Sequence, residues 1–373
     1  MFTRLNPKDG RTVSVLGMGC MRLPTTEDEK IDFARAEQII DYAYAHGVNY
    51  FDTAYPYHNG QSEAFTGRAL KKYPRESFLL ATKLPGWKLT CAEDVERIFN
   101  EQLNNCGVSY FDYYLLHAIN EKSFEENYER FRAYDTLLSL KKQGLIRNLG
   151  FSLHDKPEVL KEVLYRHEWD FVQIQLNYMD WEMQDAKTQY EMIREYGAPC
   201  IVMEPVRGGA LASLSEGANA LLKEAAPERS VASWAIRYAA GLENVLTVLS
   251  GMSNMEQVID NVSTMERFEP LNENERCALT QALELHKQNV TIPCTGCRYC
   301  MDCPSGVDIP GVFKLYNAFQ LSKLRGDFVK KYKAMEETAR ASSCIGCKKC
   351  VDECPQHISI PEMMQKVRLA VDE

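Results

Sequence analysis

Short apolar runs alternate with longer amphipathic stretches through about residue 265, and this rhythm limits the possible folds more than any other feature. The short runs have the length and the β-branched or aromatic content of strands, whereas the stretches between them have helical periodicity. Eight runs are expected to be strands, at 13–18, 50–52, 78–82, 113–116, 146–151, 171–175, 200–203 and 245–249. Eight strands with returning helices predict an α/β protein with a closed (β/α)8 TIM barrel.

A doubly wound open sheet is the competing topology for such a chain. No predicted strand is followed by a G-x-G-x-x-G sequence, the dinucleotide-binding fingerprint of an open Rossmann sheet. The strand count and the missing fingerprint both favour the barrel.

The composition of the chain argues against a nucleic-acid or membrane partner. The 373 residues carry 52 acidic against 43 basic side chains, for a net charge of -9, and no basic stretch of the kind that binds nucleic acid. No apolar run approaches the roughly 20 residues needed to cross a bilayer, and the N-terminus lacks the apolar core of a signal peptide. We expect a cytoplasmic protein with no nucleic-acid or membrane partner.

Eight of the 13 cysteines fall into two runs near the C-terminal end. The first run has spacings of x2, x2 and x2 before Cys-Pro, and the second has x2, x2 and x3 before Cys-Pro. The first three cysteines of each run are offset by 50 positions and the fourth by 51, so the segment is an internal duplication. In a reducing compartment such clusters indicate metal or redox chemistry rather than disulfides.

The second run has the spacing of bacterial ferredoxins, in which the fourth cysteine of each run serves the other cluster. The segment thus resembles a bacterial-type two-cluster ferredoxin domain, a small α+β fold, here with extra helices. The predicted ligands are Cys294, Cys297, Cys300 and Cys354 for one 4Fe-4S cluster and Cys303, Cys344, Cys347 and Cys350 for the other. Paired zinc sites are the alternative, but they rarely use three cysteines at successive x2 spacings.

Polar side chains stand where three predicted barrel strands end. Asp52 and Tyr57 follow the second strand, Lys83 follows the third and His117 the fourth. The carboxyl ends of barrel strands converge on one rim, where the chemistry of such folds is found. The Lys83 ammonium is expected to lower the pKa of Tyr57, Asp52 to keep Lys83 charged, and His117 to position a substrate oxygen. This set predicts a carbonyl reduction site.

The phrases around these residues, "FDTAYPYHNGQSE", "LLATKL", "FDYYLLHA" and "RNLGFSLHD", resemble the aldo/keto reductase family over about the first 265 residues. The resemblance implies that Tyr57 is the general acid, that Lys83 and Asp52 adjust its acidity, and that His117 orients the carbonyl. It also implies a nicotinamide cofactor that delivers hydride at the barrel mouth.

The same resemblance implies a set of cofactor contacts: Ser152, His154, Gln173, Met203, Arg207, Gly208, Gly209, Asp260 and Asn261. Several positions depart from the family pattern. Leu153 replaces an asparagine, Met203 replaces a tyrosine that stacks on nicotinamide, and Gly251 and Gln257 replace cations that hold the 2'-phosphate. The resemblance implies NADPH first, the two missing cations make NADH the alternative, and a bound flavin is left open.

We expect a barrel over 1–270, a helical linker over 271–290 and a ferredoxin-type domain over 291–373. The predicted function is an oxidoreductase that reduces an aldehyde or ketone, or oxidises the alcohol, with NAD(P)H. Its clusters would transfer electrons to a redox partner protein, such as a ferredoxin or flavoprotein, or sense redox state. The alternative is an electron-transfer protein whose barrel binds nucleotide or flavin without reducing carbonyls.

Overall fold

The computed structural model describes residues 1–289 and 291–372. The expected linker ends at Val290 and the expected ferredoxin-type domain at Glu373, and both of these residues lie outside the described ones. The chain divides into two compact units, of which the first comprises Met1–Val206 and Ser233–Leu271. The second unit combines Arg207–Ala232 with the chain from Asn272 onward. Among the described helices, none has both the length and the apolar character needed to span a bilayer.

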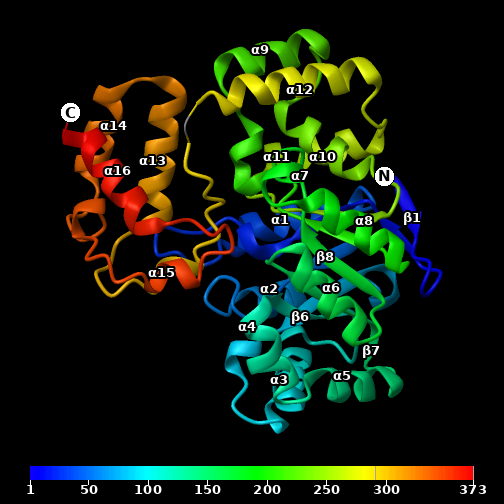
Figure 1. Ribbon diagram of the computed structural model, residues 1–373. Coiled ribbons are helices and arrows are strands. Elements are labelled where there is room, and N and C mark those ends of the chain that lie inside the picture. Colours follow the sequence, from blue (N-terminus) through cyan, green and yellow to red (C-terminus); the bar gives the residue numbers. More distant parts are fainter. Residues whose placement is uncertain (290, 373) are drawn as a thin grey trace. The chain divides into compact units, whose positions relative to one another are not determined.

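The first unit is built on a closed barrel of eight parallel strands, which confirms the predicted fold (Figure 1). Their order around the barrel is β10-β3-β4-β5-β6-β7-β8-β9. The strands are β3 Leu16–Gly19, β4 Tyr50–Asp52, β5 Leu79–Leu84, β6 Phe111–Ile119, β7 Ile146–Leu153, β8 Phe171–Gln175, β9 Cys200–Met203 and β10 Val245–Ser250. Every residue of β4, β5, β8 and β10 is buried, as expected for strands covered by helices.

Amphipathic helices surround the strands and bury their apolar faces against them. They are α1 Phe33–Ala45, α2 Ser62–Leu70, α3 Glu93–Cys106, α5 Ala133–Lys142, α6 Pro157–Arg166, α8 Ala186–Tyr196, α10 Val231–Ala240 and α11 Met255–Glu266. Two short helices, α4 Glu121–Ser123 and α7 Asp180–Met183, lie in the loops after β6 and β8. The helix expected over 124–143 is divided into a π-helical segment η4, Phe124–Glu129, and α5. The division falls at Arg132, whose φ of 52° lies in the left-handed region and cannot continue a right-handed helix.

An N-terminal hairpin closes the end of the barrel at which the strands begin. The strand expected over 13–18 is split, because β2 Thr12–Ser14 pairs antiparallel with β1 Thr3–Leu5 and only β3 enters the barrel. Between the two hairpin strands, the Asn6 side chain donates a hydrogen bond of 3.0 Å to the Tyr113 hydroxyl. Tyr113 is fully buried in the cluster of apolar side chains inside the barrel, so the hairpin is fixed to that core.

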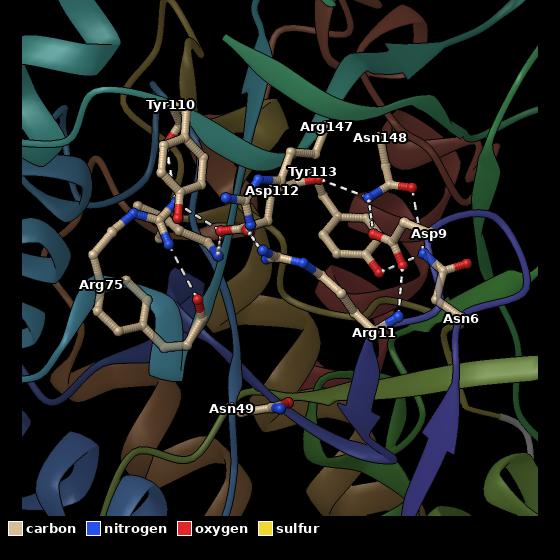
Figure 2. Close-up of polar contacts among 12 residues, drawn as sticks. Asn6, Asp9, Arg11, Asn49, Arg75, Tyr110, Asp112, Tyr113, Arg147 and Asn148 are labelled. Atoms are coloured by element: carbon tan, nitrogen blue, oxygen red, sulfur yellow. Dashed lines mark hydrogen bonds and ion pairs between the residues drawn. The ribbon is translucent and has the colours of Figure 1, made fainter. Parts of the chain in front are cut away.

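Three arginines converge on one buried carboxylate at the same end (Figure 2). Asp112 Oδ1 accepts from Arg11 at 2.7 Å and Arg147 at 3.0 Å, and Oδ2 accepts from Arg75 at 2.7 Å. The guanidinium groups of Arg75 and Arg147 also lie 3.9 and 4.0 Å from the centre of the Tyr110 ring. Interactions at the amino ends of barrel strands serve stability rather than chemistry.

The second unit is helical in its described residues. Its helices are α9 Glu216–Ala225, α12 Glu273–Lys287, α13 Ile309–Ser322, α14 Arg325–Ala334, α15 Lys349–Asp352 and α16 Ile360–Asp372. Figure 1 shows α9 beside α12, and α13 beside α14 and α16, in agreement with their contacts. The expected α+β character is wrong for the described part of 291–373, which has no strand, because the chain near the cysteines folds into tight turns.

The duplication seen in the sequence is repeated in the backbone. Gly296 and Gly346 both have positive φ, of 68° and 70°, and Arg298 and Lys348, each directly before a short helical turn, follow with 68° and 65°. Both copies then begin a long helix at an Ile-Pro pair, α13 in the first copy and α16 in the second. The two cysteine runs are therefore two copies of one structural unit.

Candidate functional site

The four residues predicted to form a catalytic set come together at the carboxyl end of the barrel. Lys83 Nζ donates to both carboxylate oxygens of Asp52, at 2.7 and 2.8 Å, and to the backbone oxygen of Thr53 at 2.7 Å. The centre of the Tyr57 ring lies 5.0 Å from Lys83 Nζ and 6.0 Å from the centre of the His117 ring. Asp52, Lys83 and His117 are buried, while Tyr57 is half-buried.

A tight turn after β4 holds Tyr57 in place. The Tyr57 amide donates to Ala54 O at 3.1 Å, and its carbonyl accepts from the Ser62 amide at 3.2 Å, at the start of α2. Between them His58 and Asn59 have φ values of 51° and 53°, so the chain reverses within a few residues. The turn fixes the phenol above the end of the strand that carries Asp52.

Tyr128, on η4, braces the strand ends that carry Lys83 and His117. Its hydroxyl lies 3.0 Å from Leu84 O and 2.6 Å from His117 O, and it accepts from the Gly86 amide at 3.1 Å. A Cβ on Gly86 would lie 2.5 Å from the Tyr128 ring, so the close approach requires glycine.

His117 lies within an irregularity of its strand. The pairing of β6 with β7 shifts register between Leu116 and Ile119, and Ala118 has a φ of 52°. The Ala118 amide donates to Ser152 Oγ at 2.8 Å, which fixes the bulged segment. Bulges of this kind re-aim a side chain next to an active site.

Burial controls the ionisation of the two side chains below the tyrosine. It raises the pKa of Asp52, and the Lys83 ammonium opposes this rise. The pKa of His117 is well below its usual value, first because of burial and then because of the Lys83 and His154 charges. His117 is therefore neutral at neutral pH, with one ring N–H available as a donor.

The pKa of Tyr57 is well above its usual value, chiefly because of burial and then because of the negative charges of Asp52 and Glu204, with Arg22 opposing. The sequence predicted a lowered pKa, and in this structure that direction is wrong. The first reason is burial of the phenol, and the second is that Lys83 is paired with Asp52 through two short hydrogen bonds and does not offset it. The phenol is a protonated group at neutral pH.

Three of the expected cofactor contacts lie on adjacent strands. Ser152 on β7 is opposite Gln173 on β8, and the Gln173 side-chain amide donates to Met203 Sδ, on β9, at 3.5 Å. Gln173 Oε1 is buried and accepts no hydrogen bond from any described residue. Because a buried oxygen of this kind needs a donor, the three residues fit an amide-bearing ring such as nicotinamide.

The other expected contacts are divided between the units. His154 is half-buried beyond β7, and Asn261 on α11 is buried and donates to Ser250 Oγ at 3.0 Å, with Asp260 beside it. Arg207, Gly208 and Gly209 belong to the second unit. Arg207 donates there to Gln356 Oε1 at 3.4 Å, and a Cβ on Gly208 would lie 1.9 Å from Thr295 O, so this turn packs against the first cysteine run.

Three residues near the catalytic set were missed by the sequence analysis. Glu204 follows β9, and its Oε1 pairs with Arg22 Nη2 at 3.1 Å. Trp87 lies beyond β5 with its ring centre 5.3 Å from that of His117, and it is 48% exposed. Their position just beyond strand ends was the available signal, but Arg22 and Glu204 are far apart in sequence and no local pattern joins them.

The eight clustered cysteines gather in two groups of four. Cys294, Cys297, Cys300 and Cys354 line one cavity, together with apolar side chains of α13. Burial and the charges of the other three raise the pKa of Cys300 to about 12. Cys350 has a pKa raised to about 11 by burial and by Cys344, Cys303 and Cys347.

Each group thus mixes three cysteines of one run with the fourth of the other. Within 1–289 and 291–372, no three or more Cys, His, Asp or Glu side chains are arranged as ligands of a single metal ion. A 4Fe-4S cluster presents a separate iron to each of its four thiolates. The donor set, all thiol sulfur in an apolar setting, fits such clusters.

Comparison with known proteins agrees with both halves of the chain. Residues 15–284 match the Aldo/keto reductase family and residues 293–358 match the 4Fe-4S dicluster domain. The chain is 26% identical to the uncharacterized oxidoreductase YqkF of Bacillus subtilis (strain 168), over 67% of this chain and 86% of that protein. It is 26% identical to L-galactose dehydrogenase of Arabidopsis thaliana, over 76% of this chain and 94% of that protein.

A further relative is the NADH-specific methylglyoxal reductase of Escherichia coli (strain K12), 24% identical over 68% of this chain and 90% of that protein. Among solved structures, the holo form of aldo-keto reductase AKR11C1 from Bacillus halodurans is 28% identical. It has a TM-score of 0.62, over 76% of this chain and 96% of that one. The family match spans well over half of the chain and includes all eight strands of the barrel. The protein belongs to the aldo/keto reductase family and is an oxidoreductase of that family with an additional 4Fe-4S dicluster domain.

Proposed function

We propose that the barrel catalyses hydride transfer between a nicotinamide cofactor and the carbonyl carbon of an aldehyde or ketone, or the reverse oxidation of the alcohol. The observation that carries the proposal is the buried Lys83–Asp52 pair beside Tyr57 and His117. The cofactor, when bound, supplies or accepts the hydride. The side chains of the protein supply the proton and hold the carbonyl oxygen.

Each of the four residues has a role consistent with its ionisation. Tyr57, which is protonated at neutral pH, gives its proton to the carbonyl oxygen during reduction. Neutral His117 donates a ring N–H to the same oxygen and orients it. Lys83, held by Asp52 and Thr53 O, lies against the Tyr57 ring and keeps the phenol in position.

The cofactor proposal rests on Gln173, Ser152 and Met203 for the nicotinamide end and on Asp260 and Asn261 for the adenosine end. NADPH is proposed first because of the family to which the chain belongs. NADH is proposed second, because Gly251 and Gln257 bring no cation to the 2'-phosphate. The holo form of the Bacillus halodurans relative supports a bound cofactor, and the name of the Escherichia coli relative supports NADH as an alternative. The substrate class proposed is a small carbonyl compound or its alcohol.

The dicluster domain is proposed to hold two 4Fe-4S clusters that exchange electrons with a redox partner protein or sense redox state. Hydride transfer moves two electrons, whereas each cluster moves one. The partner is proposed to be a ferredoxin or flavoprotein.

An anaerobic titration tests these proposals together. Purified protein is mixed with NADPH, then NADH, with and without a carbonyl compound, while the nicotinamide and cluster absorbance bands are followed. We expect nicotinamide to be consumed when the carbonyl is added. Bleaching of the clusters without a carbonyl, and no carbonyl turnover, would favour the electron-transfer alternative.

Cross-ligation of the clusters gives a prediction for paired substitutions. Cys354→Ser combined with Cys294→Ser removes two proposed ligands of one cluster, so about four irons per chain are expected to remain. Cys354→Ser combined with Cys344→Ser removes a ligand from each cluster, so iron content is expected to fall toward zero. Iron analysis and visible absorbance measure this. The opposite ranking of the two double variants would show that each run holds its own cluster.

Glu204 gives a prediction for pH dependence. Its negative charge contributes to the raised pKa of Tyr57, together with burial, Asp52 and Cys20 and against Arg22, so Glu204→Gln is expected to lower that pKa. Reduction needs protonated Tyr57 and is lost as pH rises through its pKa. The alkaline limb of the kcat profile for reduction is therefore expected at lower pH in the variant. A limb at the same or higher pH would contradict this reading.

A further inference from the structure

One wall of the barrel mouth carries a carboxylate oxygen that lacks a partner. Glu204 lies directly beyond β9, and its side chain is 13% exposed. Its Oε1 pairs with Arg22, whereas its Oε2 is buried and accepts no hydrogen bond from any described residue. Leaving a charged acceptor buried without a donor costs free energy, so this oxygen is suited to a donor brought by a ligand.

The backbone holds Glu204 in an unusual conformation. Its φ is 54°, a left-handed conformation that side chains other than those of Gly, Asn and Asp rarely adopt. Asn177 Nδ2 donates to Glu204 O at 3.0 Å, and Asn177 is itself fixed by Asp180 Oδ2 at 2.6 Å. Strain maintained by surrounding hydrogen bonds is found at sites where a side chain must point in one direction.

The opposite wall is aromatic. Trp87 follows β5, and β5 is separated from β9 around the barrel by β10, β3 and β4 on one side. The two walls thus belong to opposite sides of the mouth, with Tyr57 carried by the loop after β4. Trp87 is the exposed aromatic beside His117 and offers an apolar face to carbon-bound hydrogens.

A site with a hydrogen-bond acceptor on one wall and an aromatic face on the other fits a polyhydroxylated molecule. We propose that Glu204 determines specificity by accepting, through Oε2, a hydrogen bond from a hydroxyl group on the carbon next to the carbonyl. The preferred substrates are then α-hydroxy aldehydes and ketones. This inference rests on the proposed reductase function and narrows its substrate class.

The charge of Glu204 acts on one of the reacting groups. After burial and the Asp52 charge, the Glu204 carboxylate is the next cause of the raised pKa of the Tyr57 phenol. In the proposed arrangement, Tyr57 and His117 hold the carbonyl oxygen, and the neighbouring hydroxyl lies toward Glu204, which follows β9 at the same end of the barrel. Arg22 occupies Oε1 and leaves Oε2 to the substrate.

The test compares glyceraldehyde with propanal, which has the same chain length and no hydroxyl groups. We expect the wild-type kcat/KM to be higher for glyceraldehyde. In Glu204→Ala the ratio of the two kcat/KM values is expected to fall by about 10- to 100-fold, the range for a hydrogen bond to a charged acceptor. Glu204→Gln, which keeps the shape but loses the charge, is expected to give a smaller fall.

Glu162→Ala is the matched control, because it also removes a carboxylate paired with an arginine, Arg166 at 2.7 Å, but at an exposed position of α6. Its ratio is expected to equal that of the wild type. An unchanged ratio in both Glu204 variants, or an equal fall for both aldehydes, would overturn the inference and leave the proposed reductase function intact. Failure of the wild type to reduce either aldehyde would instead refute the proposed function, and the inference with it.

Discussion

Tyr57→Phe is expected to lower kcat for carbonyl reduction by about 10²- to 10⁴-fold, the usual contribution of a positioned general acid. Phenylalanine keeps the ring that lies beside Lys83 and His117 but has no proton to give to the carbonyl oxygen. The measurement is steady-state oxidation of NADPH with a saturating aldehyde. Cofactor affinity, followed by fluorescence quenching, should change little, because the proposed cofactor contacts lie on other strands and on α11.

Tyr55→Phe is the matched control for this variant. Tyr55 lies in the same loop, but its hydroxyl donates to Glu101 Oε1 at 3.1 Å, away from the catalytic set. Loss of this half-buried hydrogen bond should lower the free energy of unfolding by about 1 kcal/mol at most. The kcat should stay within a few-fold of the wild-type value. Equal activity of the two variants would remove Tyr57 from the role of general acid.

Lys83→Met is expected to cost both activity and stability. It leaves the Asp52 carboxylate buried without its partner, and breaking a buried ion pair in this way typically destabilises by about 3–5 kcal/mol. Burial raises the pKa of Asp52. The destabilisation by the unpaired carboxylate is therefore absent below the ordinary carboxyl pKa, where Asp52 is protonated in both the folded and the unfolded protein, and it grows as pH rises. The free energy of unfolding, measured in urea at pH 4.5 and pH 7, gives the size of the destabilisation and the direction of its pH dependence.

The double variant Asp52→Asn with Lys83→Met separates the two effects. A neutral amide does not carry the buried charge, so most of the lost stability should return while turnover remains low. A double variant as unstable as Lys83→Met would mean that the ion pair is not the source of the loss. Recovery of activity in the double variant would mean that Lys83 has no part in proton transfer.

The barrel and the position of the catalytic set were predictable from the sequence because both follow from local patterns. Apolar runs of strand length fixed the eight strands, and the residue after each run had to lie at the carboxyl rim. Asp52, Lys83 and His117 could therefore be placed near one another although 65 positions separate the first from the last. The repeat in the cysteine runs likewise predicted the repeated turns of the backbone.

What could not be predicted depends on contacts between distant loops. The ion pair of Arg22 with Glu204, and the left-handed conformation of Glu204, have no local signature. The pKa of Tyr57 was predicted in the wrong direction because the sequence places Lys83 nearby but does not show that Asp52 neutralises it. The break at Arg132 arises from its positive φ, which an arginine in the sequence does not predict.

The order of the two compact units along the chain limits how the protein can be dissected. The segment Arg207–Ala232 interrupts the barrel sequence yet belongs to the second unit, where α9 packs against α12. A fragment ending near residue 270 would keep α9, with Ala218 and Leu222 buried in the full chain, and discard its partner helix. Such a fragment would expose apolar surface and aggregate, so its inactivity would say nothing about whether catalysis needs the clusters. No single truncation point separates the two units. Cluster binding is therefore better removed by substituting the cysteines than by truncating the chain.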